Sequence, residues 1–133
     1  MHDGDTIHVT DARGRLHRIR VQGIDAPEMD QAFGVDAKRY MRRRVLGKDV
    51  TVDVAARDIY GREVGLVLCD GKDVGLAEVR DGLAWFDAPY ANELREDDRA
   101  RYAAAEANAR AAKRGIWKQR KAQPPWEFRR LTH

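Results

Sequence analysis

Residues 7–21 have the sequence IHVTDARGRLHRIRV, which contains two short runs of alternating apolar and polar residues. Alternation with a period of two is typical of strands that bury one face. The turn residues at 11–14 separate the runs, so we expect residues 7–10 and 16–21 to pair as a hairpin. The rest of the chain must then supply the elements that cover the apolar face of this hairpin.

Two more strands and three helices are expected further along the chain. Residues 50–54 and 63–69 are rich in β-branched and other aliphatic residues, as strands are. Apolar residues at steps of three and four predict helices over residues 35–46, 74–81 and 93–114. These elements predict an α+β fold that is mainly β. A small sheet curled into a barrel, with a helix closing one end, is an OB-type fold.

Length and composition exclude several classes of protein. A chain of 133 residues corresponds to one domain, at roughly 100–200 residues per domain, so we assign residues 1–133 to a single unit. No apolar run approaches the roughly 18–20 residues of a membrane span. The single cysteine, Cys69, rules out an intramolecular disulfide and a multi-cysteine zinc site.

The net charge of +3 is unevenly distributed along the chain. Residues 1–100 have a balance of −4, whereas residues 101–133 have a balance of +7. A basic C-terminal tail, about residues 118–133, beside an acidic body is typical of proteins that bind an anionic partner such as nucleic acid. A basic surface that is merely solvated is the alternative interpretation of the same pattern.

Three short segments carry side chains suited to chemistry on phosphate. Residues 3–6 are DGDT, residues 25–28 are DAPE, and residues 58–62 are DIYGR. Each segment alone is more typical of an ordinary turn or loop. Together they offer the carboxylates of Asp5, Asp25 and Glu28, and oxygen ligands of this kind are what Ca²⁺ or Mg²⁺ requires.

Two arginines complete this set of candidate side chains. Arg20 lies five residues before Asp25, with opposite strand parity, at a strand end where twist can turn it toward the same site. Arg20 and Arg62 carry fork-shaped donors that match phosphate oxygens. Carboxylates, a metal ion and two guanidinium groups are the components needed to attack a phosphodiester.

The chain resembles the staphylococcal nuclease (thermonuclease) family, whose members are Ca²⁺-dependent phosphodiesterases with an OB-fold. The resemblance extends from Asp3 to about Trp126. It is carried, in order, by the segments DGDT, RIRVQGIDAPE, FGVDAKRY, DIYGR, DGKDVGLAEVRDGLAW and GIW.

For the fold, the resemblance implies a five-stranded Greek-key barrel with three helices. Family members carry a strand of about ten residues before DGDT, whereas Met1 and His2 alone precede it here. We therefore expect a truncated first strand, in a chain that is a fragment or whose true start lies upstream. If this start is genuine, a strand-swapped dimer is expected.

For the metal site, the resemblance implies that Asp5 and Asp25 bind Ca²⁺ through their carboxylates. The backbone carbonyl of Ala26, which stands where the family usually has threonine, is implied as a further ligand. Glu28 is implied to position or deprotonate the attacking water.

For the substrate, the resemblance implies that Arg20 and Arg62 bind the phosphate. Tyr60 and Tyr90 lie where the family places tyrosines that contact the nucleotide. Ile59 replaces a lysine found in some members, which removes a contact to a second phosphate.

The function implied is a Ca²⁺-dependent endonuclease that hydrolyses DNA and RNA and leaves 3′-phosphates. The alternative is a catalytically silent nucleic-acid- or protein-binding module, as in the degenerate domains of Tudor-staphylococcal nuclease proteins. The enzyme is favoured because the chain keeps all five candidate carboxylates and arginines: Asp5, Arg20, Asp25, Glu28 and Arg62. DNA and RNA are expected as substrates, with no membrane and no stable protein partner. Two compartments are left open: secreted or periplasmic if a signal precedes the chain, and otherwise cytoplasmic.

Overall fold

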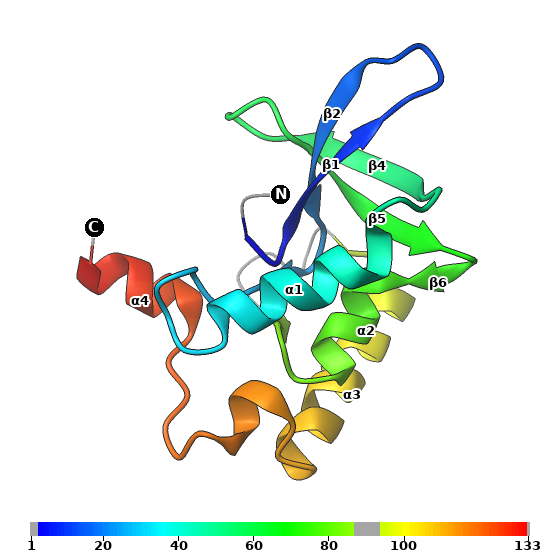
Figure 1. The fold of residues 1–133 in the computed structure, drawn as a ribbon. Coiled ribbons are helices and arrows are strands. Elements are labelled where there is room, and N and C mark those ends of the chain that lie inside the picture. The colour runs from blue at the N-terminus through cyan, green and yellow to red at the C-terminus, as the bar shows by residue number, and fades with distance from the viewer. Residues whose placement is uncertain (1–2, 87–93, 133) are drawn as a thin grey trace.

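The computed structural model describes residues 3–86 and 94–132 as an α+β fold with a mixed sheet (Figure 1). The strands are β1 (Thr6–Thr10), β2 (Leu16–Val21), β3 (Ile24–Asp25), β4 (Thr51–Arg57), β5 (Glu63–Cys69), β6 (Lys72–Asp73) and β7 (Trp85–Phe86). The helices are α1 (Gly34–Val45), α2 (Val74–Arg80), α3 (Glu96–Ala111), the 3₁₀ turn η2 (Gly115–Lys118) and α4 (Pro125–Thr132).

The main sheet is built on the hairpin that the alternating pattern predicted. β1 and β2 are antiparallel, with Thr6 opposite Arg20 and Thr10 opposite Leu16. The carboxylate of Asp11 accepts the N–H groups of Arg13 and Arg15 at 2.8 and 3.0 Å, which closes the turn. The sequence prediction of this hairpin is confirmed.

The order of strands in the main sheet is β1-β2-β5-β4, and β6 pairs with β5 beside this path. β2 and β5 are parallel, whereas β4 and β5 form an antiparallel pair with an irregularity between Val54 and Ala56. A separate two-stranded sheet joins β3 to β7, with Asp25 opposite Trp85. This small sheet fixes the end of β3, where a candidate metal ligand stands.

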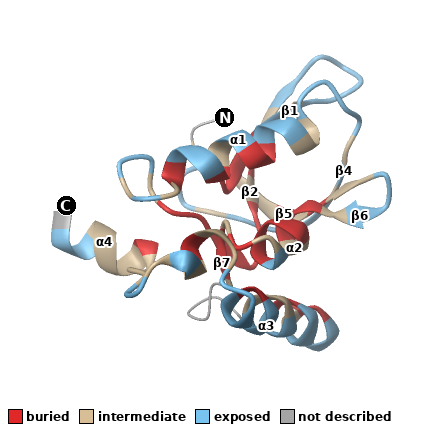
Figure 2. Ribbon diagram, turned by 60° about the horizontal axis from the view of Figure 1, so that its bottom comes forward, coloured by how far each residue is buried: buried red, intermediate tan, exposed pale blue. Residues whose placement is uncertain are grey.

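The hydrophobic core lies between the sheet and the helices α1, α2 and α3 (Figure 2). α1 turns Ala37, Tyr40 and Met41 inward, as the spacing of its apolar residues predicted. α3 contributes Tyr102 and Ala109 to the interior, while most of its surface is exposed. The core is made of buried residues from every layer, including Ile7, Ile19, Val21, Ile24, Met41, Val67, Val79 and Tyr102.

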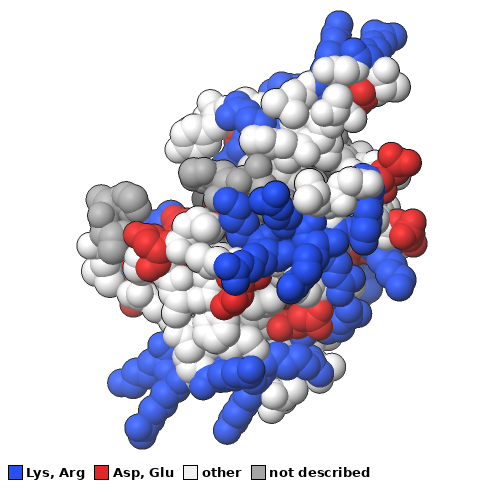
Figure 3. Space-filling model, viewed as in Figure 1, with Lys and Arg blue, Asp and Glu red and all other residues white. Residues whose placement is uncertain are grey.

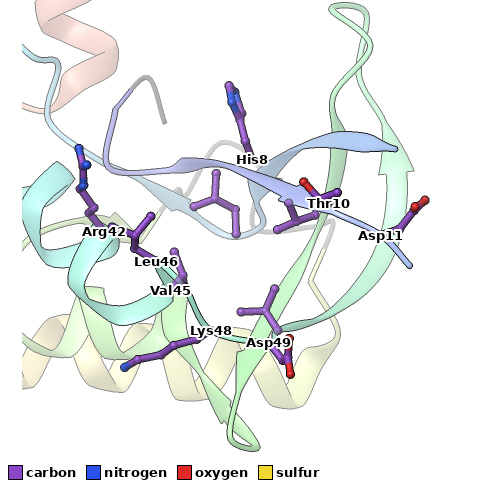
Figure 4. A pocket seen from close by; sticks show the side chains of 12 residues that line it. His8, Thr10, Asp11, Arg42, Val45, Leu46, Lys48 and Asp49 are labelled. Atoms are coloured by element: carbon purple, nitrogen blue, oxygen red, sulfur yellow. The ribbon is translucent and has the colours of Figure 1, made fainter. Parts of the chain in front are cut away.

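The sheet is open in the part of the chain that the structure describes. β1 pairs only with β2, and β4 pairs only with β5, so the two strands form opposite edges. A groove of about 660 Å³ lies between β1 and the connection from α1 to β4, with Val45, Leu46 and Lys48 on one wall (Figure 4). The closed five-stranded barrel with a truncated first strand therefore stays a prediction.

A fourth helix, α4, occupies part of the segment that the sequence assigned to a basic tail. The helix begins at Pro125, the second of two consecutive prolines. Proline is tolerated at that position because the N–H it lacks has no partner within the helix anyway. The three-helix prediction is therefore wrong by one helix among the described residues. Each of the helices described in residues 3–86 and 94–132 is too short or too polar to cross a membrane.

Candidate active site

Two buried carboxylates meet where β1 begins and β3 ends. Asp5 is 4% exposed and Asp25 is 1% exposed. Oδ2 of Asp5 accepts the N–H of Ala26 at 2.9 Å, so this bond ties the DGDT segment to the DAPE segment. The N–H of Asp5 in turn donates to Oδ1 of Asp3 at 3.2 Å. Segments that are 20 residues apart in sequence thus share one site.

Two glycines let α1 pack directly against these segments. A Cβ on Gly4 would lie 2.8 Å from Cβ of Ala37, and a Cβ on Gly34 would lie 1.9 Å from the carbonyl oxygen of Glu28. Contacts this short are not available to any other residue type. The first half of α1 therefore packs directly against both acidic segments, DGDT and DAPE.

Arg20 lies between the two buried carboxylates. Its Nη2 is 3.8 Å from Oδ2 of Asp5 and 3.9 Å from Oδ1 of Asp25. Its Nη1 donates to the carbonyl oxygen of Val21 at 2.8 Å, which orients the side chain along β2. The structure thus places Arg20, near the end of its strand, beside both buried aspartates.

Arg62 is positioned by the turn DIYGR between β4 and β5. Oδ1 of Asp58 accepts the N–H groups of Tyr60 and Arg62, each at 2.9 Å. Oδ2 of the same carboxylate accepts Nε–H of Arg62 at 2.7 Å. Although burial alone raises the pKa of Asp58, these hydrogen bonds lower it below its ordinary value. Asp58 therefore stays ionised and orients the guanidinium group.

Thr6 connects Arg62 to the buried carboxylates. Nη1 of Arg62 donates to Oγ1 of Thr6 at 3.2 Å, and the Thr6 hydroxyl donates to Oδ1 of Asp5 at 3.3 Å. Tyr60 is 67% exposed, and its ring centroid is 5.5 Å from the Arg62 guanidinium carbon. Tyr90, the second tyrosine predicted to contact the substrate, lies outside the described residues.

Glu28 differs from the two aspartates because its side chain reaches solvent. The carboxyl-bearing side chain is 21% exposed, against 2% for Asp25. The backbone N–H of Glu28 donates to Oε1 of Gln31 at 3.0 Å, and Nε2 of Gln31 donates to the carbonyl oxygen of Gln123 at 2.6 Å. The loop after β3 is thereby connected to the segment that leads into α4.

Arg129 of α4 is a further member of the site, which the sequence did not predict. Its Nη1 and Nη2 donate to Oδ1 and Oδ2 of Asp25 at 3.2 and 2.7 Å, in a bidentate arrangement. Its Nη1 is also 3.6 Å from Oε1 of Glu28. Since 104 residues separate Arg129 from Asp25, no local pattern could have indicated this pair.

The surroundings shift the pKa values of the three aspartates of the site in different directions. Burial and the neighbouring Asp5 raise the pKa of Asp3 to about 7. Burial also raises the pKa of Asp25, despite its hydrogen bonds with Arg129. For Asp5 burial acts in the same direction, but the Arg20 charge and several hydrogen bonds outweigh it and lower the pKa. Asp5 is therefore the carboxylate that the site holds most firmly in its charged form.

Residues 18–119 match the family described as staphylococcal nuclease homologues. This match covers well over half of the chain. The chain belongs to the staphylococcal nuclease family. The matched residues include Arg20, Asp25, Glu28 and Arg62, and Asp5 is joined to them by its bond to Ala26.

Named relatives in this family come from bacteria and plants. A protein of Escherichia coli O157:H7 named as an uncharacterized endonuclease is 40% identical over 128 residues, covering 96% of this chain and 79% of that protein. A probable staphylococcal-like nuclease of Oryza sativa is 38% identical over 127 residues, covering 92% of this chain and 37% of the plant protein. The chain thus spans little more than a third of that plant relative.

The donor atoms of this staphylococcal nuclease homologue suit a hard divalent cation. Ca²⁺ takes oxygen ligands at about 2.3–2.6 Å, and the carboxylates of Asp5 and Asp25 and the Ala26 carbonyl are donors of that type. Among the described residues, however, no three His, Cys, Asp or Glu side chains are grouped closely enough to hold a metal ion. The donor types fit Ca²⁺, while a guanidinium group lies between Asp25 and Glu28.

Proposed function

We propose that this chain is a Ca²⁺-dependent nuclease that hydrolyses the phosphodiester backbone of DNA and RNA and leaves 3′-phosphates. The observation that supports the proposal most is the meeting of Asp5 and Asp25, through the Ala26 N–H, with Arg20 between them. Membership of a family whose named relatives include endonucleases supports the same class of reaction.

In this proposal the two buried aspartates and the Ala26 carbonyl hold the cation. Ca²⁺, when bound, polarises the scissile phosphate by its positive charge. Asp5 is suited to this role because its lowered pKa keeps the carboxylate charged. The burial of both carboxylates keeps competing water away from their oxygens.

Glu28 is proposed as the group that orients the attacking water and accepts its proton. Its side chain reaches solvent while its backbone is held by Gln31, so it is open to water on one side. A positioned carboxylate acting as a general base contributes roughly 10²–10⁴-fold to a rate. Loss of this group should therefore slow cleavage without removing the aspartates that hold the cation.

Arg20 and Arg62 are proposed to bind the phosphate oxygens on which negative charge grows. Guanidinium forks match these oxygens bidentately. Asp58 and Thr6 hold Arg62 in place before any substrate arrives, so little reorganisation is required. Tyr60, exposed beside Arg62, offers an aromatic face to the nucleotide.

The decisive experiment measures cleavage of single-stranded DNA and of RNA with Ca²⁺ and with a chelator. Glu28→Gln is compared with Glu96→Gln, which makes the same chemical change at an exposed position in the first turn of α3. We expect Ca²⁺-dependent cleavage that falls by about 10²-fold or more in Glu28→Gln and stays unchanged in Glu96→Gln. Mass spectrometry of the products should show 3′-phosphates.

Two outcomes would contradict the proposal. Cleavage that persists in the chelator would remove the Ca²⁺ requirement. A chain that is folded by circular dichroism, binds nucleic acid and does not cut it with Ca²⁺ would instead establish the silent binding module.

A further inference from the structure

The C-terminal helix α4 places a positive charge directly on the proposed cation site. Both terminal nitrogens of Arg129 are engaged with the two carboxylate oxygens of Asp25, at 3.2 and 2.7 Å. The Asp25 side chain is only 2% exposed, whereas that of Arg129 is 39% exposed. The guanidinium group therefore lies over the mouth of the site and covers the carboxylate from the solvent side.

This arrangement occupies one lone pair on each oxygen of the Asp25 carboxylate, on the side from which solvent reaches it. A carboxylate oxygen that accepts a charge-assisted hydrogen bond directs its lone pair at the donor. Nη1 of Arg129 also lies 3.6 Å from Oε1 of Glu28, so one guanidinium group bridges two of the three predicted acidic residues.

Contacts at the start of α4 attach it to the rest of the molecule. Trp126 packs edge-on against Trp85 with ring centroids 5.5 Å apart, and Gln123 accepts the bond from Gln31 just before the helix. Arg130 and Leu131, near the far end, are exposed, and α4 extends away from the body in Figure 1. An isolated helix of eight residues is not stable in water, so the order of α4 depends on its contacts with the rest of the molecule, the Arg129–Asp25 pair among them.

We propose that Arg129 is a tethered counter-ion that competes with the divalent cation for Asp25 and Glu28. Without the cation, the guanidinium group neutralises the acidic site and α4 closes it. When the cation binds, the Asp25 oxygens exchange the Arg129 N–H groups for metal coordination, and the C-terminal half of α4 is released. This inference rests on the proposed function, because it assumes a cation at Asp5 and Asp25.

Arg20 is not expected to behave in the same way. Its Nη2 lies 3.8 Å from Asp5 and 3.9 Å from Asp25, and its Nη1 donates to the Val21 carbonyl at 2.8 Å. It can therefore remain beside the carboxylates when the cation binds. The competition is specific to the guanidinium group that makes the short bidentate contact.

The first test measures the affinity of the 133-residue chain for Ca²⁺ by isothermal titration calorimetry. Arg129→Ala is compared with Arg130→Ala, which removes the same charge from an exposed position on the same helix. In the parent chain, Ca²⁺ binding must break the charge-assisted hydrogen bonds between Arg129 and Asp25. In Arg129→Ala these bonds are already absent, so we expect this variant to bind Ca²⁺ about 10- to 100-fold more tightly. Arg130→Ala should match the parent chain. Arg129→Lys, which keeps the charge without the fork, should give an intermediate affinity.

The second test follows the helix itself by hydrogen exchange of the backbone amides in residues 126–132. In the parent chain, Ca²⁺ should accelerate exchange in this segment. In Arg129→Ala, exchange should already be fast without Ca²⁺ and should change little when it is added. This readout reports the position of α4 and does not depend on cleavage.

The outcomes separate this inference from the function on which it rests. Equal Ca²⁺ affinities in the parent chain and Arg129→Ala, or Ca²⁺ binding with no change in α4 exchange, would overturn the competition alone. If none of the variants binds Ca²⁺, both the competition and the Ca²⁺ dependence of the proposed nuclease are wrong.

Discussion

At the scale of single residues, the buried carboxyl groups differ in how their burial is offset. Asp5 accepts the Ala26 N–H, and Asp25 is engaged by Arg129. Glu78 of α2 is also fully buried, but neither of its carboxyl oxygens has a hydrogen-bond partner among the described residues. Burial first, and then the charges of Asp5 and Asp3, raise the pKa of Glu78 well above its ordinary value.

Glu78→Met should therefore stabilise the protein at neutral pH. A carboxyl group with a raised pKa in the folded state costs nothing below its unfolded pKa of about 4.5, and the cost grows as pH rises toward the folded pKa. Relief of a buried unsatisfied polar group is worth about 1–3 kcal/mol. The free energy of unfolding, measured in urea at pH 5 and pH 8, should fall with pH less steeply in Glu78→Met.

The control for this change is Glu96→Met, which alters an exposed glutamate in α3 and should leave the pH dependence as it is. If Glu78→Met is less stable than the parent at pH 8, the buried carboxyl group has a favourable role that its surroundings do not show.

Arg62→Ala is a second change argued from one side chain. It removes the guanidinium group that Asp58 and Thr6 hold beside the site, so the growing charge on the phosphate loses a donor. Loss of one such donor costs about 10²–10³-fold in kcat. Arg57→Ala, at an exposed position in β4, is the matched control in the same cleavage assay. Equal rates in the two variants would exclude Arg62 from the reaction.

At the scale of elements, the side chain of His17 adds a link between the β1–β2 turn and β5, beside the pairing of β2 with β5. Nε2 of His17 is 2.8 Å from Oδ2 of Asp11 in the turn, and Nδ1 is 2.5 Å from Oε1 of Glu63. The hydrogen bonds to Asp11 and then Glu63 raise the pKa of His17 above its ordinary value. The protonated ring donates to both carboxylates and holds the turn of the hairpin against the start of β5.

The order of the hairpin should therefore depend on pH. A histidine with a raised folded pKa contributes stability that is complete below its unfolded pKa of 6.5 and is lost as pH rises through the folded pKa. Hydrogen exchange of amides in residues 7–19 should thus accelerate above neutral pH beyond the intrinsic increase. His17→Gln should remove this extra acceleration, whereas His8→Gln, at an exposed position in β1, should keep it. A pH response that survives in His17→Gln would assign it to another group.

At the scale of the whole molecule, positive charge gathers on broad surfaces. Figure 3 shows basic side chains concentrated over α1, whose last turn carries Arg42, Arg43 and Arg44. Residues 101–133 add a balance of +7. Such surfaces attract a polyanion by its backbone and not by its base sequence.

Binding of single-stranded nucleic acid should weaken steeply with salt. If about three phosphates are neutralised, affinity for a single strand should fall by roughly 20-fold between 50 and 200 mM salt. Fluorescence anisotropy with the Glu28→Gln chain measures this without cleavage. If α1 contacts the phosphate backbone of the nucleic acid, the double variant Arg42→Ala, Arg43→Ala should show a weaker dependence of affinity on salt concentration. An unchanged dependence would assign binding to another surface. Affinity that is independent of salt would contradict the electrostatic account.

The sequence alone predicted the local elements closely. The hairpin, β5, α1 and α2 lie within a residue or so of the expected ranges, because alternation and helical spacing are properties of neighbouring residues. α3 was expected over residues 93–114 and occupies Glu96–Ala111, since helix ends depend on capping contacts beyond the pattern. The apolar positions within α1 also predicted which of its faces is buried.

The sequence by itself identified the candidate side chains of the site, because residue types and their order in DGDT, DAPE and DIYGR require no knowledge of the fold. Tertiary structure alone decided which charges meet. Within residues 3–86 and 94–132, the open edges of β1 and β4, the lack of a hydrogen-bond partner for the Glu78 carboxyl group and the pairing of Arg129 with Asp25 all depend on contacts between distant segments. A periodic pattern records which face of an element is apolar, but it does not record the partner that the face, or an arginine beyond it, will contact.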